Sequence, residues 1–312
     1  HAKEKHTIAF YEKYGVRPIE YYAKMSADDS LEQLIDFPYS VDTVFQLPRD
    51  IGRSIIAELF ERQGADIDHT NLETYLQSVV GKTLYKHFNL GYSKKFWGRD
   101  PKDIPASGAA TWISLRTTDK RLFTEWQGYP EGGYNQFMEW VKKDIPMIKA
   151  NVKGISKKGS KIEGIDTDQG IISSDLYIST IPLKSCFPEM GEDLTYIGNI
   201  LVAIKLNKGP VFPDGVGGVY FPNNYRFKRL CEYPAMTVET YPDLKNGTVI
   251  GFEYNVFPWK GGPHAESVYI EESTKACKEL CNQDPVATAF HYHPDIYPLR
   301  NSEEMEKFSK IQ

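Results

Sequence analysis

Residues 91–99 read Gly-Tyr-Ser-Lys-Lys-Phe-Trp-Gly-Arg, and residues 126–134 read Trp-Gln-Gly-Tyr-Pro-Glu-Gly-Gly-Tyr. The first segment places aromatic rings beside cations, and the second ends in a Gly-Gly pair that is typical of a tight turn. Aromatic side chains offer flat apolar faces, and lysine and arginine attract negative charge. The two segments therefore predict the wall of a pocket for a ligand that is flat and anionic.

The segment before residue 91 has the periodicity of helices. Apolar residues recur every three or four positions in residues 51–60. The pattern returns in residues 72–79, where Asn71 is a favourable capping residue. Another helix is predicted through residues 84–88, so that residues 49–90 would form a small helical bundle.

Shorter patterns lie on both sides of this bundle. Apolar spacing predicts a helix in residues 3–14 that ends at Gly15, and another in residues 137–141. The Gly132-Gly133 pair is expected to form a turn before the second of these helices. Residues 36–48 are aromatic and bounded by prolines, and we expect this segment to be extended.

The composition shifts toward short β-type runs after residue 147. Residues 148–181 predict a hairpin that leads into a buried strand at residues 175–182. Further strands are expected at residues 197–206, 217–221, 229–233 and 248–257, and a late helix at residues 266–280. The predicted fold class is α/β with α+β character, in which a helical subdomain is followed by a mainly antiparallel sheet.

The composition limits the classes of function. The chain has 312 residues with 41% hydrophobic residues, 25% charged residues and a formal net charge of −5. This balance suits a globular protein and argues against nucleic acid as a partner, because nucleic-acid binders carry a basic face. No apolar run approaches the roughly 20 residues that span a bilayer, so no membrane partner is expected.

Cysteine and histidine usage does not predict a metal site. Four cysteines are too few and too scattered for a disulfide scaffold, which favours a reducing cytoplasm. Cys277 and Cys281 lie four residues apart on a predicted helix, and His291 and His293 would face one side of a strand. Neither pair has further ligands at metal-binding spacing.

Several motifs occur in an order that resembles one enzyme family. They lie at residues 71–73, 80–85, 91–99, 104–106, 115–116, 123, 127–134, 229–232, 248–254 and 297–308. This ordered set resembles the UDP-galactopyranose mutases. The wider relatives are the flavin amine oxidases and protoporphyrinogen oxidases, to which residues 175–182 fit equally well.

The resemblance implies FAD as the cofactor and a doubly wound FAD-binding fold, of which this chain would carry the remainder. In the family, N5 of the reduced flavin attacks the anomeric carbon, the nucleotide leaves, and the sugar ring opens and recloses at a different size. The resemblance also implies a place in cell-surface polysaccharide biosynthesis.

The resemblance divides the chain into four parts. Residues 1–35 would be a remnant of the FAD domain and a linker, and residues 36–146 the helical substrate-binding domain. Residues 147–185 would supply a hairpin and strand of the FAD domain, and residues 186–312 the sheet domain with its late helix.

The elements that hold a dinucleotide are expected to be largely missing. No Gly-x-Gly-x-x-Gly pattern follows a strand in the chain, and that pattern forms the cradle for the FAD pyrophosphate. The family's C-terminal Gly-Gly-Arg segment is not present either. Flavin-binding and catalytic residues therefore stay unassigned, and the fragment is expected to be inactive alone.

The resemblance assigns substrate-binding roles to seven residues, namely Tyr92, Trp97, Arg116, Trp126, Arg229, Glu253 and Tyr297. The first two would hold the uridine base, because aromatic rings stack on bases. The two arginines would face the diphosphate through planar hydrogen bonding. Glu253 and Tyr297 would lie beside the sugar or the phosphates.

Each role has an ordinary alternative. Trp97 could be helix-end packing, the arginines could be surface residues, and Glu253 on an apolar strand needs a partner in either case. Phe88 is interpreted as packing, and Lys94, Lys95 and Lys102 as a solvated face.

The sequence departs from the family pattern near residue 116. Thr111 and Trp112 lie where the family has an additional arginine, and Trp126 replaces a common tyrosine. Because an indole lacks the hydroxyl, these departures leave the exact substrate open.

Three functions remain open. The leading hypothesis is a flavin-dependent nucleotide-sugar mutase, an isomerase with a nucleotide-sugar substrate and a possible homo-oligomeric state. The second is an amine-oxidase-type oxidoreductase with FAD. The third is a fragment that binds a nucleotide sugar without catalysis.

Overall fold

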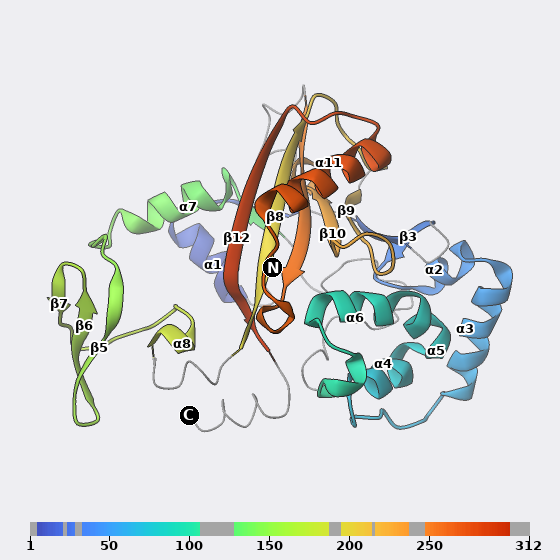
Figure 1. The fold of residues 1–312 in the computed structure, drawn as a ribbon, viewed down its shortest axis with the longest axis horizontal. Coiled ribbons are helices and arrows are strands. Elements are labelled where there is room, and N and C mark those ends of the chain that lie inside the picture. Colours follow the sequence, from blue (N-terminus) through green and yellow to red (C-terminus); the bar gives the residue numbers. More distant parts are fainter. Residues whose placement is uncertain are drawn as a thin grey trace.

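The structure is a computed structural model that describes residues 5–20, 24–28, 33–106, 128–186, 195–213, 216–236 and 247–299. Its centre is a seven-stranded sheet (Figure 1). A helical bundle lies beside one end of this sheet, and a three-stranded sheet lies on the opposite side of the molecule. The mixture of helices and mainly antiparallel strands confirms the predicted fold class.

The strands of the central sheet follow the order β12-β8-β11-β10-β9-β2-β3. Their bounds are Ala287–Pro298 (β12), Tyr196–Leu206 (β8), Thr248–Val256 (β11), Arg229–Glu232 (β10), Val216–Tyr220 (β9), Lys24–Asp28 (β2) and Leu34–Phe37 (β3). The pairs are antiparallel except for β2 and β9, which are parallel. The four strands predicted between residues 197 and 257 are confirmed.

One face of this sheet is covered by α11 (Glu266–Cys281), which crosses the strands in Figure 1. Alternate side chains of β8 and β11 are fully buried, as the period of two predicts for a strand under a helix. Tyr254 of β11 and Ser273 of α11 share a hydrogen bond of 2.8 Å between their hydroxyls. The late helix predicted at residues 266–280 is therefore confirmed.

The helical bundle runs through residues 41–103. Its elements are α2 (Val41–Gln46), α3 (Arg49–Glu61), α4 (Leu72–Val80), α5 (Lys82–Leu84), a π-helical turn (Tyr85–Asn89), α6 (Leu90–Trp97) and a 3-10 turn (Pro101–Asp103). The bundle confirms the helices predicted for residues 49–90. Phe88 is 1% exposed in its core, which confirms the packing role expected for that ring.

Two helices of the bundle begin with reciprocal caps. Asn71 Oδ1 accepts a hydrogen bond of 2.9 Å from the Thr74 amide, which confirms Asn71 as the cap of α4. Ser40 and Thr43 form the same box at the start of α2. The extended prediction for residues 36–48 is therefore wrong over α2, because this box nucleates a short helix between the two prolines.

Two helices and two short strands bring residues that precede the helical bundle together with residues that follow it. It contains α1 (Lys5–Lys13), β1 (Pro18–Glu20), β4 (Gly128–Pro130) and α7 (Gly133–Lys142), and β1 pairs with β4. The ring of Phe137 packs edge-on against Tyr11 at 4.9 Å between centroids. Gly132 and Gly133 have φ values of 78° and 84°, which confirms the predicted turn before α7.

The smaller sheet contains β5 (Val152–Lys158), β6 (Lys161–Thr167) and β7 (Gly170–Ile172). It confirms the predicted hairpin. The buried strand expected at residues 175–182 is wrong, because Leu176 is 73% exposed and Ile178 is 82% exposed. A buried strand needs neighbours on its sides, and none of the described strands pairs with this segment.

The remaining short elements are α8 (Leu183–Cys186), α10 (Tyr233–Met236) and a 3-10 turn (Pro258–Lys260). In the part of the chain that the structure describes, no helix combines the length and apolar character needed to cross a bilayer.

Candidate functional site

The aromatic and basic segment of residues 91–99 forms α6 and its C-terminal cap. The helix ends at Gly98, which has a φ of 65°. A Cβ atom at this position would lie 2.6 Å from the ring of Phe257. Glycine is therefore required here both for the left-handed backbone and for the close approach of α6 to the chain after β11.

The three lysines near α6 have different environments. Lys95 Nζ donates to the backbone carbonyls of Phe221 and Asn224, so Lys95 joins α6 to the loop after β9. The solvated role expected for Lys95 is therefore wrong, because its long side chain reaches carbonyls that α6 brings within range. Lys94 forms an exposed ion pair of 3.3 Å with Asp100, and Lys102 is exposed, as expected.

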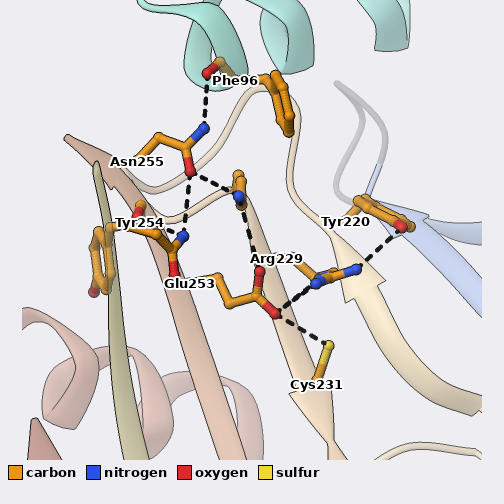
Figure 2. A network of polar contacts seen from close by, with 9 residues as sticks. Phe96, Tyr220, Arg229, Cys231, Glu253, Tyr254 and Asn255 are labelled. Carbon is orange, nitrogen blue, oxygen red and sulfur yellow. Dashed lines mark hydrogen bonds and ion pairs between the residues drawn. The ribbon is translucent and has the colours of Figure 1, made fainter. Parts of the chain in front are cut away.

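Strand pairing brings two of the predicted site residues together. Arg229 of β10 lies directly opposite Glu253 of β11. Arg229 Nε and Nη2 both donate to Glu253 Oε1, at 3.1 and 2.6 Å, and Nη1 donates to the Tyr220 hydroxyl at 3.4 Å (Figure 2). The expectation that Glu253 needs a partner on this apolar strand is confirmed.

The electrostatics of this pair favour both charged forms. Burial raises the pKa of Glu253, but the charges of Arg229 and Lys228 outweigh burial and hold the pKa below its ordinary value. The Arg229 side chain is 29% exposed and the Glu253 side chain is 13% exposed. The carboxylate is therefore enclosed, whereas the Arg229 side chain is only partly buried.

A second cation lies behind the first. The side chain of Lys228 is 6% exposed, and its Nζ lies 3.9 Å from Glu253 Oε2. Nζ donates to Asn255 Oδ1 at 2.7 Å and lies 5.1 Å from the centroid of the Phe96 ring. Burial lowers the pKa of Lys228 to about 8, although the Glu253 carboxylate acts in the opposite direction.

Aromatic rings from three elements line the same region. Tyr92 of α6 packs edge-on against Tyr220 of β9 at 5.3 Å between centroids, and it stacks with Phe96 at 6.1 Å. The Phe96 ring is also 5.5 Å from the ring of Tyr297 on β12. Burial raises the pKa of Tyr92 well above its ordinary value, so that its phenol stays protonated.

Four of the seven predicted site residues therefore lie around one network, namely Tyr92, Arg229, Glu253 and Tyr297. Trp97 is 7% exposed in the core of the helical bundle, with its ring edge-on to Phe96. Arg116 and Trp126 lie outside the residues that the structure describes, as do Thr111 and Trp112.

Four residues of the network were missed in the sequence. Tyr220, Lys228 and Phe96 contact predicted site residues, and Asn255 contacts Lys228 and Phe96. Asn255 follows Glu253 by two positions and so shares its face of β11, a relationship that strand periodicity can reveal. Lys228 and Arg229 are consecutive residues, and consecutive side chains of a regular strand point to opposite faces. The sequence pattern therefore does not indicate that both cations reach the same carboxylate.

The described residues do not fit the phosphates of a dinucleotide. The chain contains no Gly-x-Gly-x-x-Gly pattern. Within the described sheet the single parallel pair, β2 with β9, is not followed by a glycine-rich turn into a helix. The same residues contain no group of three or more His, Cys, Asp or Glu side chains placed to hold a metal ion.

Comparison with known proteins identifies relatives of this chain. The sequence model of the UDP-galactopyranose mutase family matches residues 87–283. The chain is 27% identical over 143 residues to dTDP-fucopyranose mutase of Escherichia coli, a match that covers 45% of this chain and 37% of that protein. It is 27% identical over 115 residues to the protein named probable UDP-galactopyranose mutase in Klebsiella pneumoniae, covering 35% and 29%.

Solved structures share the fold. A reduced UDP-galactopyranose mutase matches with a TM-score of 0.73 at 16% identity, over 93% of this chain and 70% of that one. A putrescine oxidase variant matches with a TM-score of 0.60 at 11% identity, over 97% and 76%.

The chain spans less than half the length of the two curated mutases that it matches. The family model nevertheless covers more than half of the chain and includes α6, β10 and β11, the elements that carry most of the network. The chain belongs to the UDP-galactopyranose mutase family.

Proposed function

We propose that this chain carries the substrate-binding part of a flavin-dependent nucleotide-sugar mutase. Such an isomerase would interconvert the pyranose and furanose forms of a UDP-sugar. The observation that carries the proposal is the position of Arg229, a partly exposed cation that is fixed by Glu253 and interacts electrostatically with Tyr92.

A nucleotide sugar needs a cation for its diphosphate, a flat apolar surface for its base and polar groups for its sugar. Arg229 supplies the cation. The diphosphate carries negative charge, and a guanidinium offers several donors in one plane. Glu253 holds the guanidinium through Nε and Nη2, which leaves the Nη1 side directed toward the Tyr220 hydroxyl. Because its orientation is fixed in advance, little side-chain entropy is lost when a phosphate binds.

The base needs a flat apolar surface. Tyr92 is half-buried and belongs to a group of rings that includes Phe96 and Tyr297. Tyr297 is 38% exposed, so part of its ring is accessible. Tyr92 remains the proposed base contact, together with Trp97, whose low exposure leaves it less surface to offer.

Polar groups beside the sugar form the third requirement. In this proposal the Tyr297 hydroxyl and the Glu253 carboxylate orient sugar hydroxyls or the adjacent phosphate. Arg116 and Trp126 keep their proposed roles on the phosphate side. The four-part division of the chain at residues 35, 146 and 185 belongs to the same proposal.

The resemblance implies FAD as the cofactor of the complete enzyme. The described residues do not form a dinucleotide cradle, so the roles proposed for them concern the substrate alone. In this proposal the described residues bind and orient the substrate, and they do not make or break its bonds. A homo-oligomeric assembly also stays a proposal.

Two alternatives follow from particular observations. The likeness to a putrescine oxidase variant, with a TM-score of 0.60, favours an oxidoreductase on the same scaffold. The described residues, which supply a cation and aromatic rings for a ligand, also suit a unit that binds a nucleotide sugar without catalysis. Affinity for a nucleoside diphosphate separates the oxidoreductase from the other two functions.

The test is calorimetric titration of the chain with UDP and with dTDP. We expect binding, and we expect Arg229→Ala to weaken it ten- to a hundredfold, because charge-assisted hydrogen bonds contribute about 1.5–3 kcal/mol. Arg226→Ala is the matched control, since Arg226 also pairs with a carboxylate, at 2.5 Å from Glu272, but stacks on Tyr269 of α11. Equal affinities of the two variants would exclude the proposed site.

A further inference from the structure

Lys228 is a buried cation that the proposed substrate contacts do not use. Its Nζ is surrounded by groups from one strand and one helix. Asn255 Oδ1 lies at 2.7 Å and Glu253 Oε2 at 3.9 Å, both on β11, and the Phe96 ring of α6 lies at 5.1 Å. The lysine therefore connects the central sheet to the helix that carries Tyr92.

Asn255 contacts both Lys228 and the backbone of α6. Its Nδ2 donates at 2.7 Å to the backbone carbonyl of Phe96, one of the last carbonyls of α6, which have no partner inside the helix (Figure 2). Its Oδ1 accepts from Lys228 at 2.7 Å and from Asn199 at 3.2 Å. Lys228 and Asn255 together thus hold both the ring and the backbone of Phe96.

The same lysine fixes the carboxylate that orients Arg229. Glu253 Oε1 accepts both hydrogen bonds from Arg229, and Oε2 faces Lys228. Each oxygen is therefore directed to a different cation. Lys228 therefore adds to the hold that Arg229 and the Cys231 thiol have on Oε1, and it helps to keep the carboxylate in the orientation that fixes Arg229.

Burial makes lysine a poor choice for stability alone. Removing a charge from water costs free energy, and a well-packed apolar side chain of similar volume is often as stable or more stable. At 6% exposure, Lys228 bears this cost. A role beyond packing explains why a charged side chain occupies the position.

We propose that Lys228 is a positioning residue for the nucleotide-sugar site. With Asn255 it fixes Phe96, and through that ring Tyr92 and Tyr297, beside the Arg229–Glu253 pair. This inference rests on the proposed function of the site, and it concerns a residue that does not itself touch the substrate.

The charged and titratable neighbours of Lys228 make its contribution dependent on pH. They are Glu253 on β11 and Arg229 and Cys231 on β10, whereas α6 contributes the neutral ring of Phe96. The pKa of Glu253 lies below its ordinary value, and burial raises the pKa of Cys231 to about 12. With a pKa of about 8, Lys228 is the member of this cluster that titrates just above neutral pH.

The first measurement is UDP affinity at several pH values in the full chain and in Lys228→Met. At about pH 7 we expect the variant to bind about tenfold more weakly with an unchanged melting temperature. Between about pH 7 and 9 the wild-type affinity should fall toward that of the variant, whose profile lacks this loss. UDP ionises identically in both titrations, so the difference between the profiles reports Lys228.

The control is Lys205→Met, which makes the same chemical change at an exposed position of β8. We expect it to bind UDP like the wild type at every pH. Equal affinities and equal pH profiles for the wild type, Lys228→Met and Lys205→Met would overturn the proposal.

The second measurement is independent of UDP. Amide hydrogen exchange in residues 90–97 should accelerate about tenfold in Lys228→Met but not in Lys205→Met, because α6 loses a contact with the sheet. If the wild-type chain does not bind UDP, the proposed function fails, and exchange still decides whether Lys228 positions α6. If Lys228→Met does not fold, Asn255→Ala replaces it, and unchanged exchange and UDP affinity in that variant would contradict the proposal.

Discussion

Arg229 lies directly opposite Glu253 in the antiparallel pair of β10 and β11, and two of its nitrogens donate to the same carboxylate oxygen. Strand register alone brings these two side chains together. The arrangement leaves the second oxygen of Glu253 facing Lys228, so that one carboxylate orients two cations. The binding properties proposed for the site depend on this shared carboxylate.

The first prediction concerns the stability provided by Glu253. Glu253→Gln should destabilise the fold by about 2 kcal/mol near neutral pH, because a buried cation and a partly buried one lose their anionic partner. The pKa of Glu253 is lower in the folded chain than its ordinary value of 4.5. Its contribution is therefore complete above about pH 4.5 and is lost as the pH falls through the folded pKa.

Urea denaturation at several pH values measures this contribution. The difference in unfolding free energy between the wild type and Glu253→Gln should be constant at neutral pH and should shrink in acid. A difference that stays the same down to about pH 3 would show that the carboxylate is not stabilised by its cations.

The second prediction concerns the Tyr220 hydroxyl. Tyr220→Phe removes the acceptor of a long hydrogen bond, 3.4 Å from Arg229 Nη1, and keeps the ring that packs on Tyr92. We expect a stability loss below about 1 kcal/mol and a two- to threefold loss of UDP affinity, because Arg229 gains freedom.

Tyr254→Phe is the control for this prediction. It removes the 2.8 Å hydrogen bond to Ser273 under α11, on the face of the sheet that α11 covers. It should lower the melting temperature without a change in UDP affinity. If Tyr254→Phe weakened UDP binding as much as Tyr220→Phe, the effect of Tyr220 would be general rather than local.

The third prediction concerns the end of α6. Gly98→Ala should destabilise the chain by about 2–4 kcal/mol, because the new Cβ meets both a left-handed backbone and the Phe257 ring at 2.6 Å. Gly261→Ala is the matched control, with a φ of 91° and nothing within 4 Å. Thermal unfolding of both variants separates the effect of the Phe257 contact from that of the backbone strain. Equal losses of stability in the two variants would show that the contact with Phe257 does not contribute.

The fourth prediction concerns the cost of burying Lys228. Its pKa is about 8 in the folded chain and 10.5 ordinarily. The unfolded chain therefore binds more protons between these values, and stability should rise with pH from about 8 to 10.5. Lys228→Met should lack this rise, which denaturation at pH 7, 9 and 10.5 would detect. A wild-type stability that falls over this interval relative to Lys228→Met would contradict the buried position of the charge.

The helices of the substrate region could be predicted from the sequence because their apolar spacing is regular and Asn71 gives a local cap. The short helix α2 could not, because prolines on both sides conceal a helix that depends on the pair of Ser40 and Thr43. The segment around Ile178 is apolar and β-like, but burial depends on neighbouring strands rather than on its own composition.

The site was predictable only in part, for a similar reason. The resemblance pointed to Arg229 and Glu253 individually, whereas their direct contact follows from the register of β10 and β11. Lys95 looked like a solvated cation, but it reaches carbonyls 126 and 129 residues away along the chain. Such long-range contacts depend on how α6 is placed against the sheet, which no local pattern specifies.

The central claim is that Arg229 binds the diphosphate of a nucleotide sugar, and the most direct measurement compares UDP with uridine by calorimetry. The wild-type chain should bind UDP at least tenfold more tightly than uridine, because only UDP offers phosphates to the guanidinium. In Arg229→Ala this preference should largely disappear, and in Arg226→Ala it should persist. A preference for UDP that survives in Arg229→Ala would contradict the account.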